Sequence, residues 1–167
     1  MKRKASKPPR LTDRQVTYRV FRRLKRYDKL SDLEQFAMFM GKAQVLELGL
    51  KRLLHRLFNY DHDRMEKWTL GRTTRELKDS GLRRDFIALL EAFADYRNHI
   101  AHEYLANEAL LRRILGRDIG RLERKYLERG IFRVEEALLI YDWLEQHGAW
   151  LLPAAAFSAP NEDTPTA

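Results

Sequence analysis

The sequence predicts an all-α protein, folded as an antiparallel bundle of four to six helices, and three observations support this prediction. Long stretches consist largely of Leu, Ala, Glu, Lys and Arg, which favour helices. Only eight glycines and five prolines occur in 167 residues, and the prolines lie near the two ends. Apolar residues recur at intervals of three and four, which is the period of a helix with one buried face. A chain of this length can bury the core of one domain.

The helices can be placed from their caps and their apolar period. The first is expected from Thr12 to about Lys29. A second begins at Ser31, where Ser31 and Glu34 have the spacing of a capping box, and continues to about Phe58. Later helices are expected at residues 70–79, 82–107 and 133–152, with Gly130 ending an intervening segment.

The predicted helical domain therefore covers residues 12–152. Residues 1–11 are basic, contain a Pro-Pro pair and are expected to be a flexible arm, while residues 153–167 lack a helical period and are expected to be a disordered tail. No run approaches the roughly 20 apolar residues of a membrane span, and no secretory signal is expected. We therefore expect a cytoplasmic protein without a membrane partner.

The composition excludes some chemistry and favours an anionic partner. The chain has no cysteine, so disulfides, thiolate metal sites and cysteine nucleophiles are excluded. The formal net charge is +8, and arginines cluster at Arg19–Arg26, Arg112–Arg117 and Arg121–Arg129. This charge fits RNA as a partner, although a solvated helical surface would have the same composition.

Two charges interrupt the apolar stripes of the two long helices. Glu47 falls inside the stripe of the second helix, and Arg97 lies near the centre of the stripe of the fourth. Because a buried lone charge is costly, we expect Glu47 and Arg97 to pair with each other. The alternatives are that Arg97 extends to the surface or that the pair only fixes the helix register. The stripes comprise Phe36, Phe39, Met40, Ala43, Leu46, Leu50, Leu54 and Leu57, and Phe86, Leu89, Leu90, Phe93, Ile100 and Tyr104.

A polar stripe on the fourth helix holds the candidate chemistry. Asp95, Asn98, His99 and His102 follow the i, i+3, i+4, i+7 spacing of one helix face. Histidine can move a proton near neutral pH, and the adjacent Arg97 can hold a phosphate with two hydrogen bonds. This set of groups suits a phosphodiester. His99 and His102 could also chelate zinc, but no cysteine or obvious third ligand accompanies them, so no metal or cofactor is expected.

The segment Arg97-Asn98-His99-Ile100-Ala101-His102-Glu103-Tyr104 resembles a known motif. Arg97, Asn98 and His102 match the R-x4-6-H motif of HEPN domains, named for higher eukaryotes and prokaryotes nucleotide-binding. With Tyr104, the segment also resembles the R-x4-H-x-Y motif of HepT-like toxins. The resemblance implies an HEPN-like helical bundle over residues 12–152. The arginine-rich sequence after Tyr104 departs from the HepT-like pattern and leaves the subfamily open.

The resemblance implies a metal-independent endoribonuclease of a toxin–antitoxin or phage-defence system. His102 would be the general base for the ribose 2′-hydroxyl, Arg97 would stabilise the phosphorane, and Asn98 would position the phosphate or His102. The product would carry a 2′,3′-cyclic phosphate, and a homodimer would form a composite site. Glu47, Asp95 and His99 would support these residues.

Tyr104 matches the tyrosine to which a nucleotidyltransferase antitoxin attaches AMP in HepT-like toxins. Its place on the apolar stripe favours a core aromatic, and the two roles do not exclude each other if its hydroxyl reaches the edge of the cleft. Two other functions stay open for the chain as a whole. One is a non-catalytic HEPN-like module that binds nucleotide or RNA, and the other is a helical protein-interaction module. A cleaving or binding site requires Arg97 and His102 to be accessible, whereas a purely structural motif would be buried and fully paired.

Overall fold

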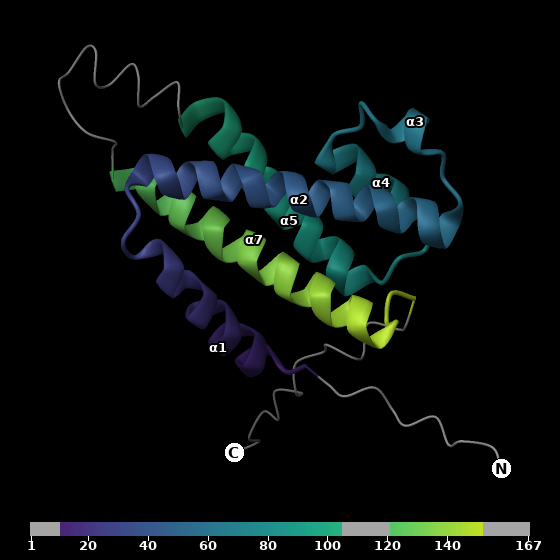
Figure 1. The fold of residues 1–167 in the computed structure, drawn as a ribbon, viewed down its shortest axis with the longest axis horizontal. Helices are drawn as coiled ribbons and strands as arrows, with labels where there is room; N and C mark the ends of the chain where they lie inside the picture. The colour runs from purple at the N-terminus through teal and green to yellow at the C-terminus, as the bar shows by residue number, and fades with distance from the viewer. Residues whose placement is uncertain (1–10, 105–120, 152–167) are drawn as a thin grey trace, which may run out of the picture.

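The computed structural model describes residues 11–104 and 121–151, and within these ranges the chain is helical and contains no strand (Figure 1). The predicted all-α bundle is therefore confirmed. None of the described helices is both long enough and apolar enough to cross a membrane. The elements are α1 (Asp13–Leu24), a 3-10 turn (Lys25–Tyr27), α2 (Asp32–Phe58), α3 (His62–Met65), α4 (Leu70–Asp79), α5 (Arg84–His99), a π-helical segment (Ile100–Tyr104) and α7 (Arg121–His147).

The long helices do not all alternate in direction. α5 runs antiparallel to α7, because its start contacts the end of α7 and its end contacts the beginning of α7. α1 also runs against α7, whereas α2 runs parallel to it (Figure 1). Three ion pairs follow α2 and α7 in the same order along both helices, and they join Asp32 to Arg124, Lys42 to Glu135 and Arg56 to Glu145.

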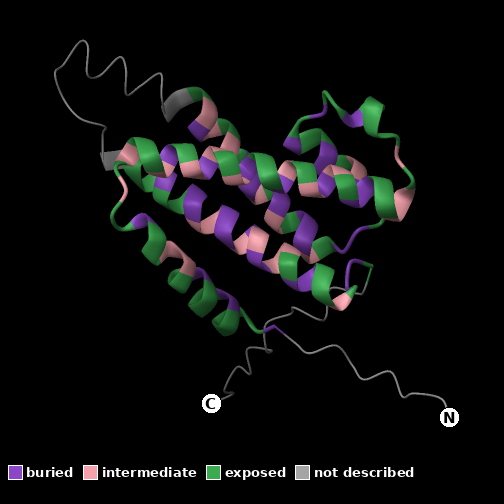
Figure 2. Cartoon of the chain, in the orientation of Figure 1, coloured by how far each residue is buried: buried purple, intermediate pink, exposed green. Residues whose placement is uncertain are grey.

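The core lies where α1, α2 and α5 pack on α7, and the predicted apolar stripes face it (Figure 2). On α2, Met40 and Leu57 are only half-buried and mark the edges of the stripe. Leu11 was assigned to the flexible arm, but it is 3% exposed and belongs to the core. It directly precedes the helix cap, where an apolar residue commonly packs against the first helical turns. The rest of the predicted arm and the tail at 153–167 lie outside the described residues.

The predicted capping box at the start of α2 is confirmed. The Ser31 backbone N–H donates to Glu34 Oε2 at 2.8 Å, and the Glu34 N–H donates to Ser31 Oγ at 3.3 Å. The hydrogen bonds from Ser31 also lower the pKa of Glu34. Thr12 and Gln15 form a second capping box at α1. α1 ends at Leu24, earlier than expected, because the chain tightens there into a 3-10 turn that points Tyr27 into the core.

Candidate functional site

The winding of the helix changes inside the predicted motif. α5 ends at His99, and Ile100–Tyr104 form a π-helix, so Arg97 lies in the last α-helical turn and His102 lies in the π-helical segment. In an α-helix, residues five apart point about 140° away from each other. A π-helix has more residues per turn, and each residue therefore advances by a smaller angle. The π-helical winding from Ile100 onward therefore makes the angle between Arg97 and His102 smaller than it would be in a uniform α-helix.

The residues predicted to be catalytic are accessible to solvent. Asn98 and His102 are exposed, and Arg97 is half-buried. Arg97 Nη1 donates to Asn98 Oδ1 at 3.3 Å, so the guanidinium and the amide form one polar group at the end of α5. Asp95 is exposed on the preceding turn. The side chain of Tyr104 lies outside the described residues. The motif therefore has the accessibility that a binding or cleaving site requires.

An aromatic cluster attaches the end of α5 to α7. The ring of His99 stacks on Tyr126 with centroids 4.2 Å apart, and the ring of Tyr96 lies 6.4 Å from the same tyrosine. Sequence reasoning missed Tyr126, which lies in the arginine-rich stretch Arg121–Arg129. His99 belongs to the predicted supporting set, and this contact lets it position the motif against α7.

The π segment is also held by unusually close packing at Gly130. A Cβ atom placed on Gly130 would overlap Cδ1 of Ile100 and would lie 3.1 Å from Cε2 of Phe39. Ile100 and Phe39 are fully buried. Gly130 was expected to end a helical segment, but α7 continues through it from Arg121 to His147. The expectation was wrong because this glycine provides room for the neighbouring helix and does not break its own.

The predicted ion pair between Glu47 and Arg97 does not form. Within residues 11–104 and 121–151, Glu47 instead pairs with Lys51 on its own helix, with Oε1 and Nζ 3.0 Å apart. α2 and α5 contact each other at Phe39 and Phe93, whose ring centroids are 6.0 Å apart. Glu47 lies about 12 Å beyond that contact along α2, and Arg97 lies about 6 Å beyond it along α5. Because α5 runs opposite to α2, these two displacements carry the charges apart.

The chain does contain a buried charge cluster, at a place that sequence reasoning missed. Glu135 on α7 is 1% exposed, and its carboxylate contacts Lys42 on α2 and Arg23 on α1, the latter at 3.9 Å. Tyr27 donates its hydroxyl hydrogen to Glu135 Oε1 at 2.8 Å. Burial, and then this hydrogen bond, raise the pKa of Tyr27. The carboxylate of Glu135 is enclosed, and its partners join α1, the 3-10 turn and α2 to α7, so this charge has a structural role in the core.

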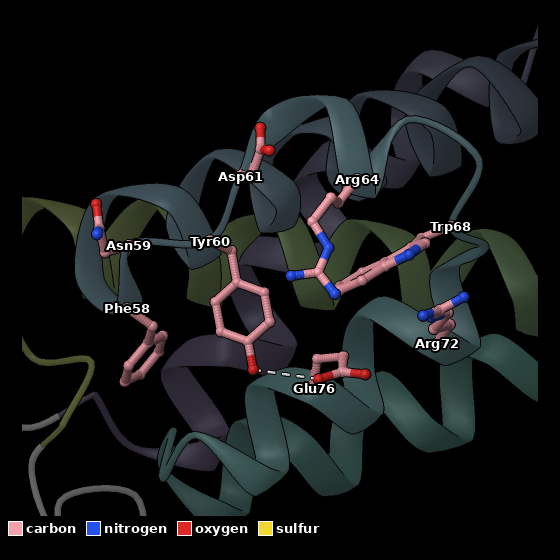
Figure 3. Close-up of a pocket in the computed structure, with 8 residues that line it drawn as sticks. All are labelled: Phe58, Asn59, Tyr60, Asp61, Arg64, Trp68, Arg72 and Glu76. Atoms are coloured by element: carbon pink, nitrogen blue, oxygen red, sulfur yellow. Dashed lines mark hydrogen bonds between the residues drawn. The ribbon is translucent and has the colours of Figure 1, made fainter.

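A pocket of about 490 Å³ lies beside α3 and α4, at the other end of α2 from the motif (Figure 3). Some of its polar groups have partners within the lining: the Tyr60 hydroxyl donates to Glu76 Oε2 at 3.1 Å, and Arg72 lies 4.3 Å above the ring of Trp68. None of the predicted site residues lines it. In the described part of the chain, no group of three His, Asp or Glu side chains is arranged to hold a metal ion.

Comparisons with protein-family models, with curated proteins and with solved structures find no match to this chain. The resemblance of residues 97–104 to the HEPN motif therefore stays a prediction.

Proposed function

We propose that this chain is a metal-independent endoribonuclease that cleaves RNA at the end of α5, as part of a toxin–antitoxin or phage-defence system. One observation carries the proposal. Arg97 and His102 are both accessible to solvent, and the helix changes to π-helical winding between them, which reduces the angle that separates them. Segments of π-helix within α-helices occur frequently at functional sites. A purely structural motif would bury and pair both residues.

The proposed reaction is a transesterification within the RNA strand. His102 takes the proton of a ribose 2′-hydroxyl, and the 2′-oxygen attacks the adjacent phosphorus. The bond from phosphorus to the 5′-oxygen breaks, so the products are a 2′,3′-cyclic phosphate and a free 5′-hydroxyl. Arg97 neutralises the charge that develops on the phosphorane oxygens, and Asn98, which already bonds Arg97, positions the phosphate. DNA lacks the 2′-hydroxyl and cannot react in this way.

The accessible motif on the single chain is compatible with a homodimer in which two such motifs face each other in one cleft. Tyr104 follows His102 by two residues and would be the position at which a nucleotidyltransferase antitoxin blocks the site with AMP. Both statements extend the proposal and have separate tests. Light scattering measures the mass in solution, and mass spectrometry locates an added AMP.

A second candidate function is RNA binding without cleavage. The hydrogen bond between Arg97 and Asn98 favours it, because these two groups together can hold a phosphate without any contribution from His102. In that case the protein would bind RNA with an accessible motif and would leave the strand intact. The same set of variants separates the two functions.

The test is cleavage of single-stranded RNA by the full chain in EDTA, with the product ends identified. We expect cyclic phosphate ends from the wild type, and a loss of roughly 10²–10⁴-fold in rate for His102→Ala. Arg97→Ala should lose activity to a similar extent. His62→Ala is the matched control, because His62 is exposed on α3 at the other end of the bundle (Figure 1). Full activity of His102→Ala, or a requirement for a divalent metal, would refute the mechanism. Binding of RNA without any cleavage by the folded wild type would support the second function.

A further inference from the structure

A row of arginines on α1 and the 3-10 turn after it surrounds a hollow beside α7. Arg19, Arg22, Arg23 and Arg26 line a pocket of about 380 Å³ together with Leu139 of α7. Arg19, Arg22 and Arg23 lie on one side of α1, and Arg26 follows in the 3-10 turn after it. The first and last Cα atoms are on the order of 10 Å apart along the helix axis. We call these four residues the arginine face of α1. A face of this length extends beyond a single phosphate group.

Most of this positive charge is not neutralised within the described part of the protein. Arg23 pairs with Asp142 at 3.2 Å and approaches Glu135 at 3.9 Å. Arg19, Arg22 and Arg26 are exposed, and none of them pairs with a carboxylate of residues 11–104 or 121–151. Like charges one turn apart on a helix repel each other, and a bound anion would remove that repulsion. The arginine face is therefore suited to hold a polyanion.

An exposed aromatic residue extends the arginine face. Tyr18 is 63% exposed and lies on α1 between Arg14 and Arg22, four residues from each. Both of these arginines are exposed. An accessible ring beside guanidinium groups is the combination on which unpaired bases stack while their phosphates are neutralised. The bases of a duplex are already stacked on each other, so this combination favours a single strand.

The burial of α1 argues against a membrane surface as the partner. Val16 and Val20 are 5% and 0% exposed and pack into the core with α7, so the apolar side of α1 is occupied (Figure 2). A helix that binds a bilayer needs that side to enter the lipid. What α1 presents to solvent is the arginine face and separate aromatic rings.

We propose that α1 is a binding surface for single-stranded RNA, in which the arginine face holds backbone phosphates and Tyr18 stacks on a base. The C-terminal end of α1 lies at the same end of the bundle as the end of α5, so a bound strand could continue toward Arg97 and His102 (Figure 1). The identity of RNA as the substrate rests on the proposed function. Binding by α1 is nevertheless measurable without cleavage.

The test measures binding of a fluorescein-labelled 12-nucleotide single-stranded RNA by anisotropy, with all variants made in the His102→Ala protein. Arg19→Ala with Arg22→Ala should weaken binding about tenfold at low salt, and should lower the slope of log K against log salt by about 1.4. Arg75→Ala with Arg84→Ala is the matched control, because both arginines are exposed and their loss changes the net charge equally. This control should bind nearly as the parent does.

Tyr18→Ala should weaken binding roughly 5- to 150-fold, the cost of losing one stacked base, whereas Tyr18→Phe should retain it. Circular dichroism checks that each variant is folded. Equal losses for the two arginine pairs, or equal affinity for a duplex of the same sequence, would overturn the proposal. So would binding to vesicles of anionic phospholipid, or to a poly-glutamate peptide, that depends on Tyr18 while RNA binding does not.

The two proposals can fail separately. If the wild type binds RNA through α1 but does not cleave it, the nuclease proposal fails and the binding surface stands. If the wild type cleaves RNA and the α1 variants bind as the parent does, only the binding surface fails.

Discussion

Gly130→Ala perturbs the contact that supports the π-helical segment. The added methyl group would overlap Cδ1 of Ile100 and press on Phe39 at 3.1 Å, and both of these side chains are fully buried. Overpacking of a core costs about 1–3 kcal/mol. Replacing glycine by alanine inside a helix stabilises by about 1 kcal/mol. The net expectation is a loss of about 0–2 kcal/mol in the free energy of unfolding.

The matched control is Gly41→Ala on α2, where nothing lies within 4 Å of the added Cβ atom. This variant gains the same helix propensity without overpacking, so it should be about 1 kcal/mol more stable than the wild type. The difference between the two variants isolates the packing cost as about 1–3 kcal/mol. Urea denaturation followed by circular dichroism measures both free energies of unfolding.

A second substitution tests the identity of the contact. Ile100→Val removes the Cδ1 atom that the new methyl group would overlap, and alone it should cost about 0.5–1.5 kcal/mol. Combined with Gly130→Ala, it should cost less than the sum of the two single changes, because the methyl group fills the space left by Cδ1. If Gly130→Ala is as stabilising as Gly41→Ala, or if the two changes are additive, the close packing at Gly130 does not hold the π segment.

Three further predictions concern ion pairs and hydrogen bonds far from the motif. Lys42→Met should cost about 3 kcal/mol by urea denaturation, because the buried carboxylate of Glu135 keeps its hydrogen bond from Tyr27 but has only the more distant Arg23 to balance its charge; an unchanged unfolding midpoint would contradict this. Tyr27→Phe should cost about 1.5–3 kcal/mol through the lost hydrogen bond to that carboxylate. The pKa of Tyr27 is raised in the folded state, so this tyrosine stabilises the fold fully below pH 10 and progressively less as the pH rises above 10. Above pH 10, Tyr27→Phe should therefore lose less unfolding free energy than the wild type does. The hydrogen bond from Arg56 lowers the pKa of Glu145, whose contribution is therefore present above pH 4.5 and is lost as the pH falls below it. Glu145→Gln should flatten the acid side of a plot of unfolding midpoint against pH, and a curve of wild-type shape would contradict the assignment.

Local sequence signals predicted most of the helices, because caps and apolar stripes act within a few residues. Ser31 and Glu34 marked the start of α2, and the helix expected at 70–79 is α4. The π-helical segment could not be predicted in this way, since it depends on how Ile100 fits against Gly130 of another helix. A glycine in a helical pattern can indicate either the end of the helix or a close approach of another helix. Only the position of the neighbouring helix distinguishes the two.

The candidate site was predictable as a set of residues but not as an arrangement. The motif from Arg97 to His102 is continuous in the sequence, so finding it required no knowledge of the fold. A uniform α-helix, however, would direct these two residues about 140° apart. The contact between the rings of His99 and Tyr126 exists because α5 packs antiparallel to α7, and no local sequence pattern predicts that packing.

The error about Glu47 shows what an interrupted apolar stripe can and cannot indicate. The stripe shows on which side of its helix a charge lies, but it does not show which other helix, if any, packs against that side. Glu47 lies at the edge of the core, its side chain is 20% exposed, and Lys51 four residues later meets its charge at the surface. That Glu-to-Lys spacing was visible in the sequence and already indicated a surface pair.

The buried pair of Glu135 and Lys42 also has a local sequence pattern, although other charges share that pattern. Glu135 and Lys42 each have apolar residues one turn before and one turn after them, and neither has an opposite charge three or four residues away on its own helix. Each of these two charges has its partner on the other helix, because α2 and α7 run side by side in the same direction. Arg97 and Glu91 have the same kind of local surroundings, yet Arg97 is half-buried and Glu91 is exposed. The absence of a local partner therefore only narrows the candidates for a buried ion pair, and the packing of the helices decides among them. The apolar neighbours are Ile131, Leu138 and Leu139 for Glu135, and Met38, Phe39, Val45 and Leu46 for Lys42.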